Sequence, residues 1–230
     1  MIALANIMEI GLWIFYIIIP ILILYFIYLV FTKAFQYMGF STFEAIIIVF
    51  ISFLFGFEII IFGFNISNIY LFSYKNWIVA INTGGAIIPI LLSIYLIIKK
   101  KITLWKILIG IIIVAIITFF VTKPVADKGI IAYFPYWLLP SFVASLSSIF
   151  LSWKNYIKAA PIAYISGTIG VLIGADFLHL WELLDYPINT SRTAVLGGAV
   201  VFDMIYITGI IAVILDGLIM FRKRKKGKIS

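Results

Sequence analysis

Residues 170–179 read GVLIGADFLH, and residues 197–203 read GGAVVFD. Each stretch lies in a long apolar run, and each carries one carboxylate, Asp176 in the first and Asp203 in the second. An ionised carboxylate at membrane depth costs about 2.5–3.5 kcal/mol on insertion scales, so an aspartate there is expected to serve a function. The two stretches predict a hairpin of apolar helices, from about 158 to about 221, that carries the functional site.

The composition predicts an integral membrane protein. Of the 230 residues, 65% are hydrophobic and only 11% are charged, and the mean hydropathy is +1.23. Such a chain cannot cover itself with a polar surface, and its apolar runs are long enough to cross a bilayer. The loops between these runs are too short to hold a further domain. We therefore expect one integral membrane domain, residues 1–230, with an all-α fold.

The apolar runs predict a polytopic transmembrane helix bundle of about seven spans. Helices are expected because a bilayer admits only helices and closed barrels, and continuous apolar runs are not typical of barrel strands. The expected spans are approximately 10–32, 43–64, 77–98, 104–122, 131–152, 158–184 and 194–221.

The basic residues predict the orientation. Thirteen of the 17 lysines and arginines lie in one set of alternate loops or in the tail 222–230, and four lie in the other set. The positive-inside rule places the C-terminus in the cytoplasm and the N-terminus outside, in a multi-pass protein of the cell membrane. The basic tail is also expected to attract anionic lipid headgroups. Because the net charge of +8 lies in short loops and this tail, it does not indicate nucleic-acid binding.

The predicted topology brings several polar residues to one level. Asp176 and Asp203 each lie about nine residues from the outer end of their helix, which is about 13 Å below the outer surface. Asn82 and Glu58 also fall in the outer half of their spans. His179 is one turn beyond Asp176 on the same helix face. These five residues form the predicted ion- or substrate-binding set.

Other interpretations of the same residues stay open. The two aspartates could form a hydrogen-bonded pair that only fixes helix packing. His179 could bond to a carbonyl group, and Glu58 has no titratable neighbour on its own helix. The absence of cysteine and the presence of a single histidine exclude thiolate and multi-histidine sites, so neither a metal site nor a cofactor is predicted.

Gly84, Gly85 and Pro89 predict a break in the third span. Broken helices at membrane depth often line substrate paths, although glycine and proline also serve as ordinary kinks and packing points. Residues 56–58 and 84–88 resemble residues 174–176 and 197–201. This similarity raises the hypothesis of a repeat of three spans, one linking span and three spans.

Three blocks of the sequence resemble a family of uncharacterised prokaryotic multi-pass membrane proteins that share a domain of unknown function. The blocks are INTGGA through Pro89, AYISGTIG through Asp176, and GGA through Asp203 to the residues TGIIAV at 208–213. The resemblance implies that Asn82, Asp176 and Asp203 belong to the motifs of the family. It implies no activity.

A partial resemblance points to intramembrane aspartyl proteases of the presenilin and signal-peptide-peptidase group. That group uses Tyr-Asp on one helix and Gly-x-Gly-Asp on the next. Here Gly174-Ala175-Asp176 lacks the first glycine, Phe202-Asp203 replaces Tyr-Asp, the order is reversed, and no Pro-Ala-Leu motif follows.

Three functions are compatible with the sequence. The leading hypothesis is a small transporter or a proton- or cation-coupled carrier that uses Asp176 and Asp203 to bind an ion or a small solute. One alternative is an aspartyl protease in which the same two residues are catalytic. The other is a non-catalytic subunit of a larger complex, in which the aspartates pair with a helix of a partner protein.

Overall fold

The fold is mostly helical, as the sequence predicts. The computed structural model describes residues 2–125, 127–153, 155–198 and 204–225. Within these ranges the α-helices are α1 (Ile2–Met38), α2 (Thr42–Leu54), α3 (Ile88–Lys100), α4 (Leu104–Val121), α5 (Leu139–Leu151), α6 (Ala159–Val171), α7 (Leu178–Asp185) and α8 (Met204–Lys225). Two π-helical turns are η1 (Thr83–Ile87) and η4 (Leu172–Phe177), and two 3-10 turns are η2 (Tyr136–Leu138) and η3 (Tyr156–Lys158).

Short strands complete the fold and form small sheets. They are β1 (Ile60–Ile61), β2 (Phe64–Asn65), β3 (Asn68–Tyr74), β4 (Trp77–Asn82), β5 (Thr122–Val125), β6 (Gly129–Ala132) and β7 (Arg192–Leu196). The hairpins β1-β2 and β5-β6 are two-stranded, and the third sheet has the order β3-β4-β7. In that sheet β4 is antiparallel to β3 and parallel to β7, although more than 100 residues separate β4 from β7.

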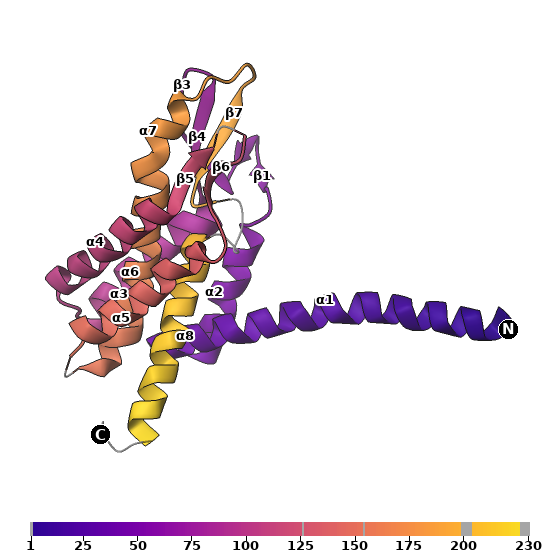
Figure 1. The fold of residues 1–230 in the computed structure, drawn as a ribbon, viewed down its shortest axis with the longest axis horizontal. Coiled ribbons are helices and arrows are strands. Elements are labelled where there is room, and N and C mark those ends of the chain that lie inside the picture. The colour runs from indigo at the N-terminus through magenta and orange to yellow at the C-terminus, as the bar shows by residue number, and fades with distance from the viewer. Residues whose placement is uncertain (1, 126, 154, 199–203, 226–230) are drawn as a thin grey trace.

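The sheets gather at one end of the helix bundle, and the C-terminus lies at the other end (Figure 1). The helix α8 runs from the sheet end towards the C-terminus beside α5 and α6, whereas α1 projects sideways from the bundle. The α2 helix begins with a capping box, in which Ser41 Oγ accepts from the Glu44 amide and Glu44 Oε2 accepts from the Ser41 amide. Such a box satisfies two backbone donors that the first turn of a helix leaves open.

The α6 helix is the centre of the bundle. Every residue from Ala159 to Thr168 is buried, and the helix contacts α1, α3, α4, α5 and α8. Glycines let α6 and α8 pack closely, because a Cβ added at Gly167 would lie only 3.2 Å from Gly209 Cα on α8. Small residues of this kind are typical of helix interfaces in lipid, where packing drives association.

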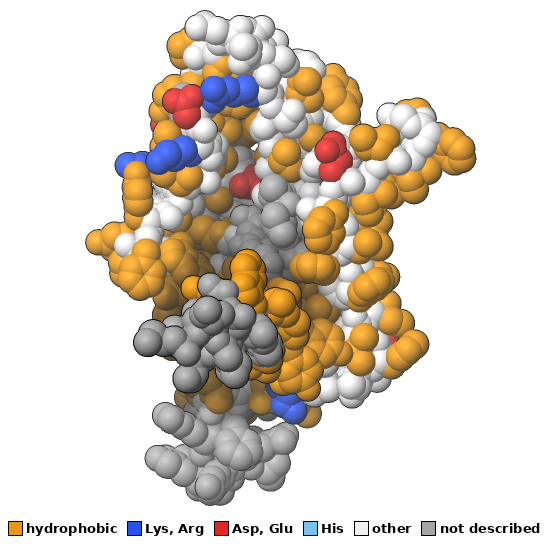
Figure 2. Space-filling view, turned by 90° about the vertical axis from the view of Figure 1, so that its right-hand side faces the viewer, with side chains coloured by type: hydrophobic (Ala, Val, Ile, Leu, Met, Phe, Trp, Pro, Cys, Tyr) orange, Lys and Arg blue, Asp and Glu red, His pale blue; other side chains and the backbone are white. Residues whose placement is uncertain are grey.

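The apolar helices make this a membrane protein. Four helical segments are long and apolar enough to cross a bilayer, Phe15–Met38, Thr83–Lys100, Leu104–Val121 and Tyr156–Asp185. Three shorter apolar helices accompany them, Thr42–Leu54, Tyr136–Leu151 and Met204–Ile219. Figure 2 shows hydrophobic side chains over most of one face of the molecule, with most of the visible charges towards the sheet end. Lipid is the solvent that such a surface requires.

Four of the predicted spans are not helical over their whole length. The end of span 43–64 is the β1-β2 hairpin, and spans 77–98, 131–152 and 194–221 begin in β4, β6 and β7. In the first case a two-residue turn with positive φ at Phe62 (+51°) and Gly63 (+82°) reverses the chain. The prediction of continuous helices is wrong at these ends because short runs of β-branched and aromatic residues suit a strand as well as a helix.

The basic loops fall into two separate groups. Lys158 Nζ donates to the Lys101 carbonyl oxygen at 2.7 Å, and the Lys100 side chain lies against Gly39. The connections α1–α2, α3–α4 and α5–α6 therefore meet at one end of the bundle. Lys75 and Arg192 lie in the strand region instead. This arrangement agrees with the division of the basic residues in the sequence, and the assignment of one end to the cytoplasm stays a prediction.

Candidate functional site

The site lies where two parallel strands each end in a pair of glycines. The β4 strand leads through Asn82 and Thr83 to Gly84-Gly85, and its neighbour β7 leads directly to Gly197-Gly198. A Cβ added at Gly85 would lie 1.9 Å from the Gly197 carbonyl oxygen, so glycine is required for this contact. Gly197 and Gly198 also have positive φ values, +87° and +62°, which residues with a side chain rarely adopt.

Asn82 organises the first glycine pair. Its side chain is buried and begins η1, with Oδ1 accepting from the Gly85 amide at 2.7 Å. The Nδ2 group donates to Asn68 Oδ1 at 2.8 Å, across the β3-β4 ladder. Asparagine is a preferred residue at a helix start because its side chain replaces a missing backbone acceptor. Both ends of the Asn82 amide are therefore used to hold the turn, and Pro89 follows near the start of α3.

Asp176 lies on the second π-helical turn, η4. Such turns are rare in proteins, and those that do occur are often found at functional sites. Gly174 brings η4 close to α4, because a Cβ there would lie 2.4 Å from the Ala115 carbonyl oxygen. The Asp176 side chain is half-buried, and its Oδ2 accepts from the Gly197 amide at 2.6 Å. The carboxylate therefore joins the α6–α7 helix to the loop that leads into α8.

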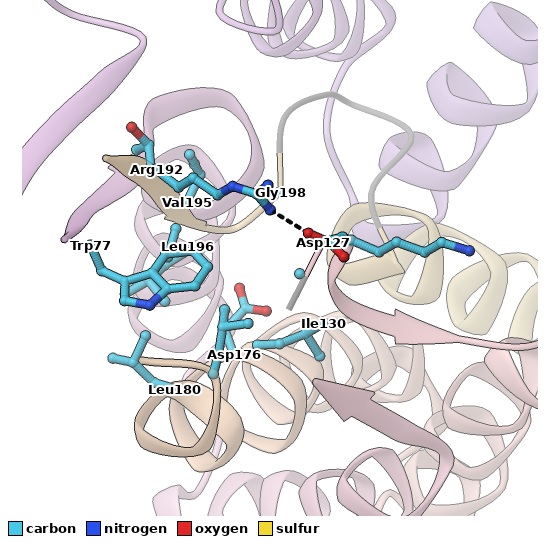
Figure 3. Close-up of a pocket in the computed structure, with 14 residues that line it drawn as sticks. Trp77, Asp127, Ile130, Asp176, Leu180, Arg192, Val195, Leu196 and Gly198 are labelled. Atoms are coloured by element: carbon cyan, nitrogen blue, oxygen red, sulfur yellow. Dashed lines mark hydrogen bonds and ion pairs between the residues drawn. The ribbon is translucent and has the colours of Figure 1, made fainter. Parts of the chain in front are cut away.

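Two cavities meet at Asp176. The first has a volume of about 350 Å³ and is lined by Trp77, Ile130, Leu180 and residues of β7, and the second has a volume of about 360 Å³ and is lined mainly by apolar residues such as Trp137 and Ile205. Asp176 lines both. Figure 3 shows its carboxylate directed into the first cavity. Cavities of this size hold small molecules, and a few polar groups usually fix the orientation of the ligand.

The first cavity has a charged rim. Arg192 on β7 forms an ion pair with Asp127 at 2.9 Å, and Lys128 also lines the cavity. In Figure 3 the Arg192–Asp127 pair lies on the opposite side of the cavity from the helix that carries Asp176. The pair is well exposed, so its effect on stability is small. The Arg192–Asp127 pair nevertheless places one positive and one negative group at the rim of the first cavity.

The His179 side chain lines neither of the two cavities and contacts Phe119 and Glu182 instead. Its ring is buried and stacks on the Phe119 ring, with centroids 4.5 Å apart. Nε2 lies 3.1 Å from the Phe119 carbonyl oxygen, which can only accept, and Nδ1 lies 3.2 Å from Glu182 Oε2. These contacts link α7 to the end of α4. They match the interpretation of a histidine bonded to a carbonyl group.

Glu58 and Asp203 do not join the site within the described structure. Glu58 lies beyond the end of α2, exposed, and accepts from Asn65 Nδ2 at 2.8 Å. Its predicted place inside a helical span is wrong, since α2 ends at Leu54. Asp203 lies outside the described residues, so the distance between the two aspartates is not part of the structure. Asp176 and Asn82 are thus the predicted residues that the structure brings to the two glycine pairs.

The fully buried aspartate of the described chain is Asp216, which is not among the predicted site residues. Asp216 on α8 is 1% exposed, whereas Asp176 is half-buried. The serines that contact Asp216 lie on α5 at spacings of three and four residues. That periodic row of serines, Ser141, Ser145, Ser148 and Ser152, is the signal that could have revealed it.

Comparison with known proteins identifies a family and no activity. A family model with the description "Protein of unknown function (DUF1614)" matches residues 58–215, which is more than half of the chain. This range contains the three sequence blocks on which the resemblance to an uncharacterised family depends, and the match confirms that resemblance. No curated protein and no solved structure matches the chain.

Proposed function

The chain belongs to the DUF1614 family of proteins of unknown function, and since that description assigns no activity, we propose a function from the site itself. The protein is a small membrane transporter, a proton- or cation-coupled carrier, and Asp176 is the carboxylate that binds the coupling ion. The observation that carries the proposal is the position of Asp176, which lines two neighbouring cavities of different polarity.

A coupled carrier must bind both an ion and a solute, and the two cavities offer a place for each beside Asp176. The cavity beneath the Arg192–Asp127 pair opens among polar groups, whereas the second lies mainly among apolar residues of β6, η2, α6 and α8. A carboxylate between them attracts a proton or a cation, and the low-polarity surroundings strengthen that attraction. A solute in either cavity would therefore interact with the charge state of Asp176.

The bond from the Gly197 amide supplies a route for coupling. Asp176 Oδ2 holds the loop that follows β7, and this loop leads into α8. An ionised carboxylate accepts such a bond more strongly than a neutral acid does. Binding of a proton or cation would loosen the hold on Gly197, and the position of the loop would then depend on occupancy.

The test is transport by the full chain in proteoliposomes. Internal pH and solute uptake are followed under imposed gradients of protons, sodium and potassium, for wild type and for Asp176→Asn. The asparagine can still accept from Gly197, so the fold is kept while the charge is lost. We expect uptake to fall at least about tenfold, which corresponds to about 1.4 kcal/mol.

Asp185→Asn is the matched control. Asp185 belongs to the same α6–α7 segment but is exposed, with its side chain paired to Lys75. Transport should continue in this variant. Flux by Asp176→Asn equal to that of wild type under every gradient would refute the role of Asp176. Cleavage of a helical substrate that is lost in Asp203→Ala would favour the protease instead, and stable copurification with another membrane protein would favour the subunit.

A further inference from the structure

Asp216 forms a closed hydrogen-bonded cluster with α5, in the half of α8 that lies towards the C-terminus. Ser145 Oγ lies 2.6 Å from Asp216 Oδ1, and Ser148 Oγ lies 2.6 Å from Asp216 Oδ2. Ser148 Oγ also lies 2.7 Å from the Ser145 carbonyl oxygen. All three residues are at least 98% buried, and none lines the two cavities that meet at Asp176.

Counting hydrogens identifies the form of Asp216 that fits this cluster. A carbonyl oxygen cannot donate, so the single hydroxyl hydrogen of Ser148 is used in the bond to the Ser145 carbonyl. The short contact between Ser148 Oγ and Asp216 Oδ2 then requires a hydrogen from Asp216. Ser145 supplies the hydrogen for Oδ1. With a protonated Asp216, each of the three contacts has a hydrogen of its own; with an ionised carboxylate, two of them must share one.

Among the described side chains around Asp216, little would balance a negative charge. On α1, the Tyr37 ring lies against the neighbouring Gly217. Lys33 Nζ is directed to Gln36 Oε1 and lies over the same Tyr37 ring. On α6, the residues near the start of the helix, from Ala159 to Ala163, carry no titratable group. Among the side chains that the structure describes, no lysine or arginine forms an ion pair with Asp216. A buried charge without a partner is strongly disfavoured.

We propose that Asp216 is a proton-binding site, in which the neutral acid donates from Oδ2 to Ser148 Oγ and accepts from Ser145 Oγ at Oδ1. On release, the O–H bond breaks, its electron pair stays on Oδ2, and the proton passes to water that reaches the cluster. The Ser148 hydroxyl then turns from the Ser145 carbonyl to the carboxylate. As a statement about proton binding, this proposal is independent of transport.

The use of this proton in transport rests on the function proposed above. Asp176 lies at the sheet end of the molecule, and Asp216 lies about six residues, or about 9 Å of helix, before the basic residues that begin at Arg222. The two carboxylates would then bind a proton near opposite ends of the bundle. Asp176 would exchange it with the cavities, and Asp216 with the end that holds the basic loops.

Infrared spectroscopy of the full-length protein in detergent tests the proposal without any transport assay. A protonated carboxyl group has a C=O stretching band that a carboxylate lacks. At neutral pH we expect such a band in wild type and in Asp176→Asn, sensitive to exchange into D2O, and its loss in Asp216→Asn. Raising the pH should remove the band from wild type reversibly. A carboxylate band at neutral pH that disappears in Asp216→Asn would overturn the proposal.

Two further measurements keep the result decisive. If Asp216→Asn does not fold, Ser148→Ala replaces it, because loss of the acceptor of the Asp216 hydrogen bond should shift the frequency of the Asp216 band. Thermal unfolding is also recorded in sodium, potassium and choline salts. Any difference in melting temperature between the three salts is expected to be the same in wild type and in the Asp216 variant, because such a difference would come from Asp176. A stabilisation by sodium that vanishes in the Asp216 variant would mean that the cluster binds a metal cation, and this would overturn the assignment to a proton.

Discussion

Asp176 and Asp216 are two aspartates in apolar helical segments, and their surroundings are opposite. Asp176 lies on a π-helical turn, half-buried, bonded to a backbone amide and open to two cavities. Asp216 lies on a regular α-helix, sealed between two serines. The sequence around each is equally apolar. The difference comes from what the neighbouring elements present, since β7 leads to a glycine pair with a free backbone amide for Asp176 to bind, and α5 offers a row of hydroxyl groups.

This comparison separates function from stability. An open carboxylate is available to ligands, so changes there should alter activity more than stability. A sealed carboxylate satisfies two buried hydroxyl groups, so changes there should alter stability directly. Substitutions in three places test this difference: at Gly197, which Asp176 holds; at Ser148, which contacts Asp216; and at Lys75, which pairs with the exposed Asp185.

The largest effect is expected from Gly197→Ala, which acts on the loop that Asp176 holds. Gly197 has φ +87°, and an added Cβ would lie 2.5 Å from Ala86 Cβ and 2.8 Å from the Ala86 amide nitrogen. The left-handed backbone costs about 1–2 kcal/mol and the collision about 1–3 kcal/mol more. Unfolding in detergent should therefore occur at much lower denaturant concentration than in wild type.

Gly63→Ala is the matched control for this change. Gly63 has a similar φ of +82°, but nothing lies within 4 Å of an added Cβ. Only the backbone term of about 1–2 kcal/mol applies there. Equal destabilisation by the two substitutions would show that the close contact between the Gly197 loop and η1 does not exist.

An intermediate effect is expected from Ser148→Ala, which acts on Asp216. The change removes the bond to Asp216 Oδ2 and leaves that oxygen buried without its partner, at a cost of about 1–3 kcal/mol. Ser147→Ala is the comparison, because Ser147 is partly buried and bonds only to the Ala144 carbonyl oxygen in its own helix. Thermal unfolding of both variants measures the difference. If Ser147→Ala were as destabilising as Ser148→Ala, the hydrogen bond between Ser148 and Asp216 would not stabilise the fold.

The smallest effect concerns the exposed pair of Lys75 and Asp185 at the sheet end. Lys75 Nζ donates to Asp185 Oδ1 at 3.0 Å, and this hydrogen bond raises the pKa of Lys75 above its ordinary value of 10.5. A raised pKa in the folded state means that the pair contributes its stability fully below the unfolded value and loses it as the pH rises through the folded value. Stability curves of wild type and Lys75→Met should therefore differ slightly near neutral pH and converge in strong alkali. A gap that widens with alkali would contradict the contact.

The helical class and the grouping of the basic loops could be predicted from the sequence, because hydropathy and loop charge act at the level of whole segments. The short strands could not. Residues 60–65 and 77–82 are mostly apolar, and they are extended because they pair with other strands, β1 with β2 and β4 with both β3 and the distant β7. Local pattern has no information about such a partner.

Only part of the candidate site could be predicted, again because contacts between segments far apart in the sequence decide the rest. Asp176 and Asn82 stood out as polar residues in apolar runs, and the structure places each beside a glycine pair. Glu58 was a weaker candidate, with no titratable neighbour on its own helix, and it lies in the exposed segment between α2 and β1. Asp216 did not join the predicted set, because its closeness in sequence to the basic tail favours a side chain that extends towards that tail. Its serine partners lie on α5, about 70 residues away, and no feature of α8 alone reveals them.

The parallel pairing of β4 with β7 also determines the order in which the protein can be assembled. During synthesis, the segment Trp77–Asn82 is made more than 100 residues before the strand that covers its second edge. Until Leu196 has been synthesised and has reached the membrane, β4 presents an unpaired edge and Asp176 has no Gly197 amide to bind. An unpaired edge readily joins other strands. Chains halted before Arg192 are therefore expected to aggregate or to require a chaperone, and the ion binding proposed at Asp176 would be among the last properties that a nascent chain acquires.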